Sequence, residues 1–404
     1  MSSEWLEVTL GEFVRLQRGH DLTASEQEPG NVPIMGSAGQ NGTHSKALAN
    51  GPGVVVGRSG ASAGRVHFSE VDYWPHNTCL YVTDFLGNSP RFAYYLLQTI
   101  DLASYNSGSA QASLNRNFLY SIKLDIPSRH IQDRIAEFLD SLDHRINLLR
   151  ETNFTLEAIA QALFKSWFVD FDPVRAKLGG RVPEGMDEAT AALFPDGFEG
   201  AKLSAVPRGW GVGTLADMSV LNPESWSTKK HPDIVAYIDL ANAKDNEISE
   251  VMDYEFDEAP SRARRVLRSG DTIIGTVRPG NRSFAYIHAP PGNLTGSTGF
   301  AVLRPSAIET TEFVYLAATQ DSSIEHLTHV ADGGAYPAIR PDVVSALRCV
   351  IPVPEVLEAF HGVTAPLLEN VCENQRRART LASLRDTLLP RLISGQLRLP
   401  DVEN

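Results

Sequence analysis

The sequence has few cysteines and no long hydrophobic run. The three cysteines, Cys79, Cys349 and Cys372, lie far apart, which is the wrong spacing for a zinc knuckle or a disulfide framework. No run of about 18 apolar residues could span a membrane, and residues 1–11 lack the basic and apolar pattern of a signal peptide. We therefore expect a soluble, cytoplasmic protein whose thiols are reduced.

Basic charge is also in deficit. Lys and Arg number 36 against 49 Asp and Glu, which gives a net charge of -13. Such a balance argues against non-specific binding of polyanions, because Lys and Arg contacts to phosphate supply most of that affinity. Residues 261–305 depart from the average, with seven arginines against the single acid Asp271. These arginines are either a binding surface or ordinary solvated side chains.

The motifs of several enzymes are missing. The fragment nearest to the Asn-Pro-Pro-aromatic segment of an adenine methyltransferase, residues 222–225, lacks the second proline and the aromatic residue. The glycine-rich residues 57–64 do not end in the Gly-Lys-Ser/Thr of a phosphate-binding loop. The histidines form no ligand cluster, and Asp170 and Asp172 on a helix end would point to different faces. We therefore predict neither catalytic nor metal-binding residues.

The chain does contain an internal repeat. Hydrophobic residues (42%) and charged residues (21%) are typical of a folded protein, and 404 residues allow two or three domains. Each half opens with Trp and then Thr-Leu, at Trp5 and at Trp210. Residues 54–58 with the following loop and Arg65 match residues 272–278 with Arg282. A constant offset of 225 relates Gly108, Leu114, Ile122 and Pro127 to Gly333, Ile339, Leu347 and Pro352.

Each half ends in a heptad pattern. Apolar residues recur at alternating spacings of four and three from Ile131 to Trp167, and again from Val356 to Leu392. Prolines precede both segments, as is usual at the start of a helix. The two helices would pack on each other as an antiparallel coiled coil, or alternatively each would pack on its own domain.

The predicted fold class is α+β, with two α/β heads joined by two long helices and an internal two-fold pseudo-repeat. Short runs rich in Val, Ile, Tyr and Phe between Gly, Pro, Asn and Ser clusters indicate the strands of the heads. The predicted segments are a first head (1–127), a central helix (128–172), a linker (173–207), a second head (208–353), a C-terminal helix (354–395) and a tail (396–404).

Several motifs of the chain are similar to those of a known family. The most specific is residues 159–174, IAQALFKSWFVDFDPV, followed by the PEGM and LFP segments that begin at Pro183 and Leu193. Further matches are residues 108–115, 261–264 and 277–279, and the segment LRDTLLPRLISG that begins at Leu384. On these residues the chain resembles, over nearly its whole length, the specificity (S) subunit of a type I restriction-modification system.

The resemblance implies two target recognition domains, held apart by an antiparallel pair of helices, that each read one part of a bipartite double-stranded DNA target. It implies partners: two methyltransferase subunits that methylate adenine with S-adenosylmethionine, and restriction subunits that cleave DNA with ATP and Mg. We expect no cofactor in this chain. The partner surface would include the following residues: Phe164, Trp167, Phe168, Asp170, Phe171, Leu388 and Leu392.

The candidate DNA-binding residues lie in the loops that correspond between the two halves. Asn and Gln suit adenine, whereas Arg suits guanine or phosphate. In the first head they are Arg58, Ser59, Arg65, Asn77, Thr78, Ser109, Gln111, Asn115 and Arg116. In the second head they are Arg278, Asn281, Arg282, Ser297, Thr298, Tyr336 and Arg340.

A competing interpretation is a coiled-coil scaffold with two protein-binding heads. Two observations count against it. Residues 33–48 have no counterpart in the second half, and residues 235–258 have none in the first. Loops that diverge on a shared frame are what the reading of two different DNA sequences would require.

Overall fold

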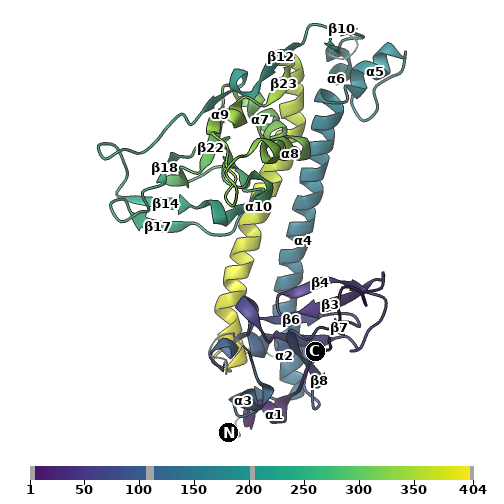
Figure 1. Cartoon of the computed structure of the whole chain (residues 1–404), viewed down its shortest axis with the longest axis vertical. Coiled ribbons are helices and arrows are strands. Elements are labelled where there is room, and N and C mark those ends of the chain that lie inside the picture. Colours follow the sequence, from purple (N-terminus) through teal and green to yellow (C-terminus); the bar gives the residue numbers. More distant parts are fainter. Residues whose placement is uncertain (1–4, 106–112, 201–204, 401–404) are drawn as a thin grey trace. The chain divides into compact units, whose positions relative to one another are not determined.

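A computed structural model describes residues 5–105, 113–200 and 205–400 (Figure 1). The chain forms two compact units, unit 1 from residues 1–148 and 378–404, and unit 2 from residues 149–377. Two long helices, α4 (Arg129–Phe168) and α10 (Pro354–Ile393), each contribute one part to each unit. Within the described ranges, no helix has the length and apolar character needed to cross a membrane.

The described residues of the unit 1 head form three small sheets, one longer helix and the short helices α1 (Leu10–Phe13) and α3 (Arg116–Leu119). Its strands and main helix are β1 (Trp5–Thr9), β2 (Arg15–Arg18), β3 (Val32–Gly36), β4 (Gly39–His44), β5 (Gly53–Gly57), β6 (Val66–Ser69), β7 (Trp74–Pro75), β8 (Cys79–Asp84), α2 (Pro90–Gln98) and β9 (Lys123–Pro127). The sheets have the strand orders β1-β9, β2-β8-β5-β6 and β4-β3-β7, and only the β3–β7 pair is parallel. Strand β5 is buried along its whole length because it lies in the middle of its sheet.

The head of unit 2 has the same plan with additions. Its strands are β12 (Gly211–Thr214), β13 (Ser219–Leu221), β14 (Ile234–Ile238), β17 (Met252–Glu255), β18 (Ala263–Val266), β19 (Thr272–Gly275), β20 (Phe284–Tyr286), β21 (Leu294–Ser297), β22 (Phe300–Pro305) and β23 (Arg348–Ile351). Helices α7 (Thr311–Thr319), α8 (Asp321–Val330) and α9 (Pro341–Ser345) follow β22. The sheets have the orders β12-β23, β13-β22-β19-β20 and β17-β14-β21-β18.

Corresponding hydrogen bonds confirm that the two heads repeat each other. In unit 1 the amide of Leu10 donates to Ile122 O at 2.8 Å, and in unit 2 the amide of Leu215 donates to Leu347 O at 3.0 Å. The parallel pair β3–β7 corresponds to the parallel pair β14–β21. Both long helices have 40 residues, and their first residues are offset by 225. The second head adds β18, α8 and the hairpin β15 (Ala243–Lys244) and β16 (Glu247–Ile248).

The two long helices pack antiparallel in both units. In unit 2, Phe164 of α4 meets Phe360 of α10, whereas the earlier Asn153 donates from Nδ2 to the O atom of the later Val371 at 3.1 Å. In unit 1, Asp143 accepts from Arg385 Nη1 at 2.5 Å and from the Tyr95 hydroxyl at 2.7 Å. The helices also pack on the heads, so both packing arrangements considered from the sequence occur together.

Residues 170–207 connect the end of α4 to the second head. They form α5 (Asp172–Leu178), α6 (Glu188–Leu193) and the short pair β10 (Phe198–Glu199) and β11 (Val206–Pro207). Lys177 Nζ donates to the O atom of Ala191 at 3.1 Å and thus stabilises the C-terminal end of α6. This segment therefore has local structure of its own.

Candidate functional site

In each head one turn follows the central strand of the four-stranded sheet. We call residues 58–65 after β5 and residues 276–283 after β19 the central turns. Each is closed by the same hydrogen bond, from Gly57 N to Arg65 O at 2.7 Å and from Gly275 N to Ser283 O at 2.7 Å. The central turns therefore have equivalent positions in the two sheets.

Two further loops flank each central turn. In the first head Arg58 N donates to Thr78 O, and Leu114 N donates to Arg58 O, both at 2.9 Å. In the second head Thr276 N donates to Gly299 O at 2.8 Å, and Ile339 N donates to Thr276 O at 2.9 Å. The structure therefore brings together three segments of each head from which the candidate residues were chosen.

The hydrogen bonds also correct one correspondence. Because Gly57 pairs with Arg65 and Gly275 pairs with Ser283, Arg65 corresponds to Ser283, so its predicted match to Arg282 is wrong by one residue. At the resulting offset of 218, Gly60 corresponds to Arg278, and Gly64 corresponds to Arg282. All four have positive φ, at 74° and 87° for the glycines and 48° and 58° for the arginines. The two turns therefore share a backbone shape but differ in side chains.

Arg278 and Tyr336 form a contact on the surface of the second head. The Cζ atom of Arg278 lies 4.5 Å from the centroid of the Tyr336 ring, and its Nη2 donates to Ala335 O at 2.8 Å. Both side chains are exposed, and Tyr336 is 70% exposed. Asn281 in the same turn is also exposed. These three candidates are accessible to a ligand.

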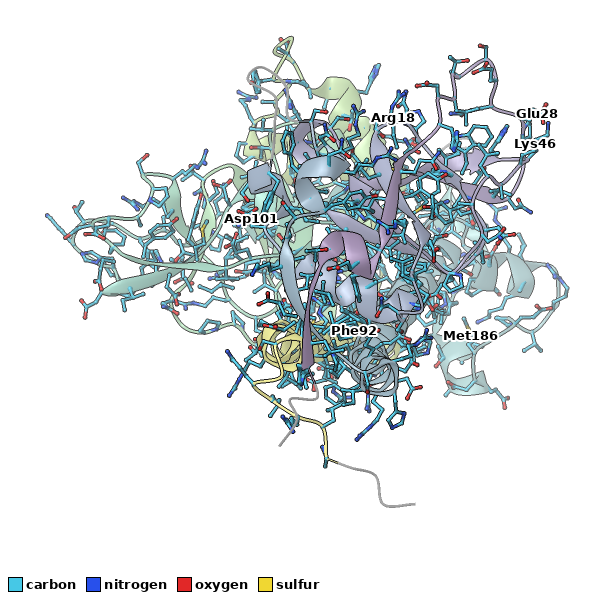
Figure 2. The ribbon with its side chains drawn as sticks, turned by 90° about the horizontal axis from the view of Figure 1, so that it is seen from below. Arg18, Glu28, Lys46, Phe92, Asp101 and Met186 are labelled. Carbon is cyan, nitrogen blue, oxygen red and sulfur yellow. The ribbon has the colours of Figure 1, made fainter. Side chains whose placement is uncertain are left out.

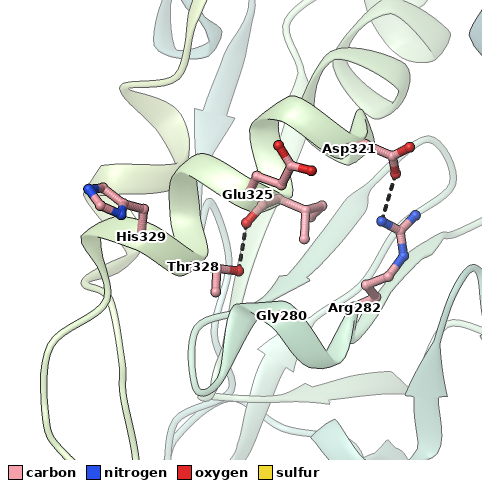
Figure 3. Close-up of a pocket in the computed structure, with 7 residues that line it drawn as sticks. Gly280, Arg282, Asp321, Glu325, Thr328 and His329 are labelled. Carbon is pink, nitrogen blue, oxygen red and sulfur yellow. Dashed lines mark hydrogen bonds and ion pairs between the residues drawn. The ribbon is translucent and has the colours of Figure 1, made fainter.

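Arg282 points to a different set of partners. Its Nη1 donates to Asp321 Oδ1 at 2.8 Å (Figure 3). Its Nε pairs with Asp245. It lines a pocket of about 480 Å³ together with Gly280, Asp321, Ile324, Glu325, Thr328 and His329. Two carboxylates in this lining make the pocket unsuitable for a phosphate group. Arg282 is therefore held by acidic neighbours of its own chain.

The other candidates of the second head differ in accessibility. Ser297 is fully buried, and its hydroxyl accepts from Gly299 N at 3.2 Å, so it supports the loop. Thr298 is exposed, and its amide donates to Arg262 O. Arg340 is largely exposed and pairs with Asp342 at 3.1 Å. Thr298 and Arg340 can therefore reach a ligand, whereas the Ser297 side chain cannot.

In the first head several candidates bond to one another or to nearby loops. Arg58 Nη1 donates to Asn77 O at 3.4 Å, and Asn77 Nδ2 donates to Asp21. The Thr78 hydroxyl contacts Ser37 N at 3.3 Å and His76 Nδ1 at 3.1 Å. Ser59 donates through its amide to the hydroxyl of Ser37 at 3.3 Å.

The remaining candidates of the first head have mixed roles. Asn115 accepts from Asn117 N at 3.0 Å as the N-cap of α3 (Arg116–Leu119), and Arg116 Nη1 donates to Leu16 O at 3.0 Å. Both contacts stabilise the fold locally. Arg65 is exposed. Ser109 and Gln111 lie outside the described residues.

Sequence reasoning missed Ser37 as part of this site. Its hydroxyl donates to Thr78 O at 2.5 Å and accepts from Ser59 N, and its O atom lies 3.0 Å from His67 Nε2. The available signal was the glycine-rich stretch 33–48, for which the sequence showed no counterpart in the second half. The structure corrects that expectation, since its strand β3 corresponds to β14. Nearby, Glu28 and Lys46 lie beside each other (Figure 2), and the Ser45 hydroxyl together with the charge of Lys46 lowers the pKa of Glu28.

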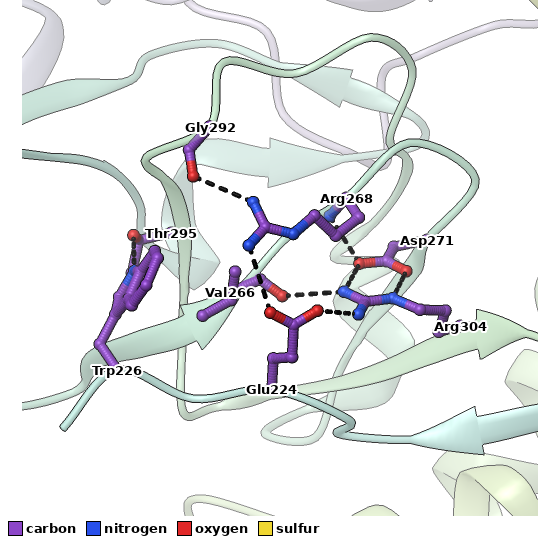
Figure 4. Close-up of polar contacts among 8 residues, drawn as sticks. All are labelled: Glu224, Trp226, Val266, Arg268, Asp271, Gly292, Thr295 and Arg304. Atoms are coloured by element: carbon purple, nitrogen blue, oxygen red, sulfur yellow. Dashed lines mark hydrogen bonds and ion pairs between the residues drawn. The ribbon is translucent and has the colours of Figure 1, made fainter. Parts of the chain in front are cut away.

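Most arginines of segment 261–305 are neutralised by acids from elsewhere in unit 2. Arg304 makes a bidentate pair with the fully buried Asp271, at 2.8 and 2.9 Å, and also bonds to Glu224 (Figure 4). Arg268 bonds to Glu224 at 3.2 Å, and Arg262 bonds to Asp239 at 2.7 Å. Most of these guanidinium groups are therefore paired with carboxylates of the same unit. The segment is a weaker basic surface than its composition suggested.

The predicted partner-binding residues are mostly core residues. Phe164, Trp167 and Phe168 are at most 4% exposed and pack in the hydrophobic core of unit 2, and Leu392 is fully buried in that of unit 1. A partner could not touch these four side chains while the cores are closed. The aromatic pattern of that motif is thus explained by packing. Asp170, Phe171 and Leu388 are partly exposed.

Two observations bear on metal and thiol chemistry in the described residues. Among the described residues, no three His, Cys, Asp or Glu side chains gather closely enough to hold a metal ion. Burial raises the pKa of the Cys79 and Cys349 thiols to about 12, so both are protonated at neutral pH. What the loops offer is hydrogen-bond donors and acceptors, which suit recognition.

Comparison with known proteins defines first the class and then the family. The structure matches the crystal structure of a type I restriction-modification S subunit from M. genitalium with a TM-score of 0.58 and 16% identity, over 99% of this chain and 97% of that one. The shared fold is thus two β-rich heads on a pair of antiparallel helices.

Sequence comparison agrees with the fold. Residues 2–158 match the family described as "Type I restriction modification DNA specificity domain". The chain is 25% identical to the type I restriction enzyme HindI specificity subunit of Haemophilus influenzae, over 76% of this chain and 77% of that protein. It is 24% identical to the MjaIX specificity subunit of Methanocaldococcus jannaschii, over 78% and 71%. The chain belongs to the specificity subunits of type I restriction-modification systems, which are non-catalytic DNA specificity subunits.

Proposed function

We propose that the chain recognises a bipartite double-stranded DNA target, with one head reading each part. The observation that carries the proposal is the pair of central turns, which share backbone shape and flanking loops but present glycine at two positions in one head and arginine in the other. Two heads that share a backbone frame but carry different side chains are suited to recognise two different DNA sequences.

In this proposal the chain directs chemistry that partner subunits perform. Two methyltransferase subunits methylate adenine with S-adenosylmethionine, and restriction subunits cleave DNA with ATP and Mg. Among the described residues no three His, Cys, Asp or Glu side chains form a metal-binding group, and the sequence has no Gly-Lys-Ser/Thr loop. The net charge of -13 is compatible with DNA binding if partner subunits supply part of the phosphate contacts.

The partner surface would include the partly exposed Asp170, Phe171 and Leu388. The buried residues of the same motif, such as Trp167, contribute by shaping that surface from below. The candidate DNA surface comprises the exposed Arg65, Arg278, Asn281 and Tyr336 of the central turns and their flanking loops, together with the partly buried Arg58.

Methylome sequencing tests the proposal. A host strain expressing the chain with its methyltransferase partner should gain methylated adenines within one motif made of two defined parts and a spacer of undefined sequence. The same strain without the chain should lack that motif. A methylated motif with a single continuous part, or none, would contradict the proposal.

A mobility-shift assay separates this function from that of a protein-binding scaffold. The chain with its methyltransferase partner should bind DNA that contains the motif more tightly than random DNA of equal length, at fixed salt. Equal affinity for both DNAs would favour the scaffold.

A further inference from the structure

The two arginines of the second central turn adopt a backbone conformation that favours glycine. Arg278 has φ 48° and ψ 64°, and Arg282 has φ 58° and ψ 41°. A side chain in this left-handed region costs free energy that glycine avoids. The first head has glycine at both equivalent positions, Gly60 and Gly64. The fold of the turn therefore does not need arginine. The two arginine side chains have roles other than forming the turn.

The contacts of Arg282 tie the turn to the rest of unit 2. Besides Asp321 at the start of α8, it pairs with Asp245 in the hairpin β15–β16. The next residue, Asn246, is 2% exposed and donates from Nδ2 to Glu157 Oε1 on α4 at 2.8 Å. Its O atom accepts from Gln375 Nε2 on α10 at 2.7 Å. A chain of direct contacts thus connects the turn to both long helices.

The contacts of Arg278 leave it facing outward. Its amide donates to Pro337 O at 2.7 Å, and its guanidinium uses one N–H on Ala335 O and one face on the Tyr336 ring. Within the described ranges no carboxylate pairs with it. A guanidinium has five N–H donors, so those not directed at Ala335 remain available in an orientation that the ring limits.

We propose that Arg278, oriented by Tyr336, reads a guanine in the half-site of the second head, and that Arg282 is a positioning residue that holds the turn through Asp245 and Asn246. The inference rests on the function proposed above. Guanine is the base whose O6 and N7 atoms accept two parallel hydrogen bonds from one arginine. The two arginines of one turn thus have separate roles, one toward the DNA and one toward the helices.

The test uses the full chain together with its methyltransferase partner, by methylome sequencing and by methylation rates on defined duplexes. Arg278→Ala should remove the preference for guanine at one position of one half-site, a loss of about 5- to 150-fold in discrimination there. All other positions should keep their preference. Arg278→Gly gives the same result on a turn relieved of strain, so misfolding cannot account for it. Tyr336→Phe should retain the preference, and Tyr336→Ala should weaken it.

Arg282→Ala and Asp245→Ala should lower kcat/KM on every duplex about equally and leave each base preference unchanged. Arg282→Lys should restore part of the rate, because a lysine can still pair with Asp245 or Asp321. Arg208→Ala is the matched control, since Arg208 is an exposed arginine that pairs with the exposed Asp196. It should change neither the rate nor the preference.

The outcomes separate this inference from the function on which it rests. A wild-type complex that methylates no bipartite motif contradicts the proposed function. A wild-type complex that does so, combined with an Arg278→Ala variant that keeps every base preference, overturns the role of Arg278. Relaxed discrimination at a base position in Arg282→Ala overturns the positioning role, and so does full wild-type activity of that variant.

Discussion

At one set of equivalent positions, unit 1 and unit 2 hold their long helices to their heads in chemically different ways. In unit 1, Tyr95, Asp143 and Arg385 form a polar triad between α2, α4 and α10. The repeat places Leu316, Leu368 and Ala160 at the equivalent positions of unit 2, and all three are buried. One backbone frame thus tolerates either a set of hydrogen bonds or apolar packing.

Unit 2 places its polar contacts elsewhere: Asn246 bonds to both long helices, and a further network lies inside the head. Asp271 is fully buried between Arg304 and the amide of Arg268, and Glu224 bonds to both arginines. The comparison teaches that composition does not reveal which charges are free to bind a ligand, because most arginines of segment 261–305 form ion pairs within unit 2. The two units should therefore respond differently to changes of charge.

The largest effect is expected from the Asp271→Ala variant. It leaves the partly buried Arg304 without its bidentate partner, and we expect unit 2 to lose about 3 to 5 kcal/mol of unfolding free energy. Hydrogen exchange of peptides from each unit measures this, and protection should fall in unit 2 while unit 1 is unchanged. Asp196→Ala removes an exposed pair and should cost less than about 1 kcal/mol. Equal effects of the two variants would show that the buried network does not stabilise the head.

The next effect concerns the polar triad of unit 1. Asp143→Leu alone leaves the Tyr95 hydroxyl and the Nη1 of Arg385 without their acceptor, while Arg385 keeps its pair with Asp386. We expect a loss of about 2 to 3 kcal/mol in unit 1. The triple variant Tyr95→Leu, Asp143→Leu and Arg385→Ala installs the residues of unit 2 and should recover most of this loss. Chemical denaturation followed by hydrogen exchange compares the two. A triple variant less stable than the single one would mean that the units are not interchangeable at this point.

A smaller effect distinguishes the units by pH. Burial, with a further contribution from Asp245, raises the pKa of Glu157 to about 7, whereas Ala382 occupies the equivalent position of α10. Because the folded state holds this proton more tightly than the unfolded state, unit 2 should lose about 1 to 2 kcal/mol as pH rises from about 4.5 to 7.

Glu157→Gln should abolish that part of the pH dependence and keep the acceptor for Asn246. The measurement is the free energy of unfolding of each variant at several pH values. An unchanged slope in Glu157→Gln would assign the pH dependence to other groups.

The smallest effect tests the central turns. Gly60→Arg gives the first head a left-handed arginine at a position where an added Cβ meets no atom within 4 Å. Only the conformational cost remains, and we expect a loss of about 1 kcal/mol in unit 1. Thermal unfolding checks this value. Gly64→Arg should cost more, since its Cβ would lie 2.8 Å from Ala103 N. Equal costs would argue against the steric difference between the two turns.

Much of the fold could be predicted from the sequence, because the repeat and the heptads depend on local patterns. The offset of 225 relates the first and last residues of α4 to those of α10. The Trp and Thr-Leu pairs located the start of each head. The site was harder to predict. No local pattern shows that Arg282 would turn to Asp245 and Asp321, or that Asn115 would cap a helix.

The partner motif shows the same limit in another form. Phe164, Trp167 and Phe168 stand out in the sequence because they are large and aromatic, and that property suits a core as well as an interface. Only the packing of Phe360 and Phe313 against them distinguishes the two. Contacts between residues distant in the chain decided this question, and a sequence pattern does not contain them.

Unit 1 is made of two segments from opposite ends of the chain, which has a consequence for synthesis on the ribosome. Its core needs Leu389, Leu392 and Ile393, which are made only after all of unit 2. At about 5 to 20 residues per second, the first head waits on the order of ten to fifty seconds for them. Unit 2 is continuous in the chain and can close first. The head that is translated first is therefore completed second, and until then it exposes the apolar surface to which chaperones bind.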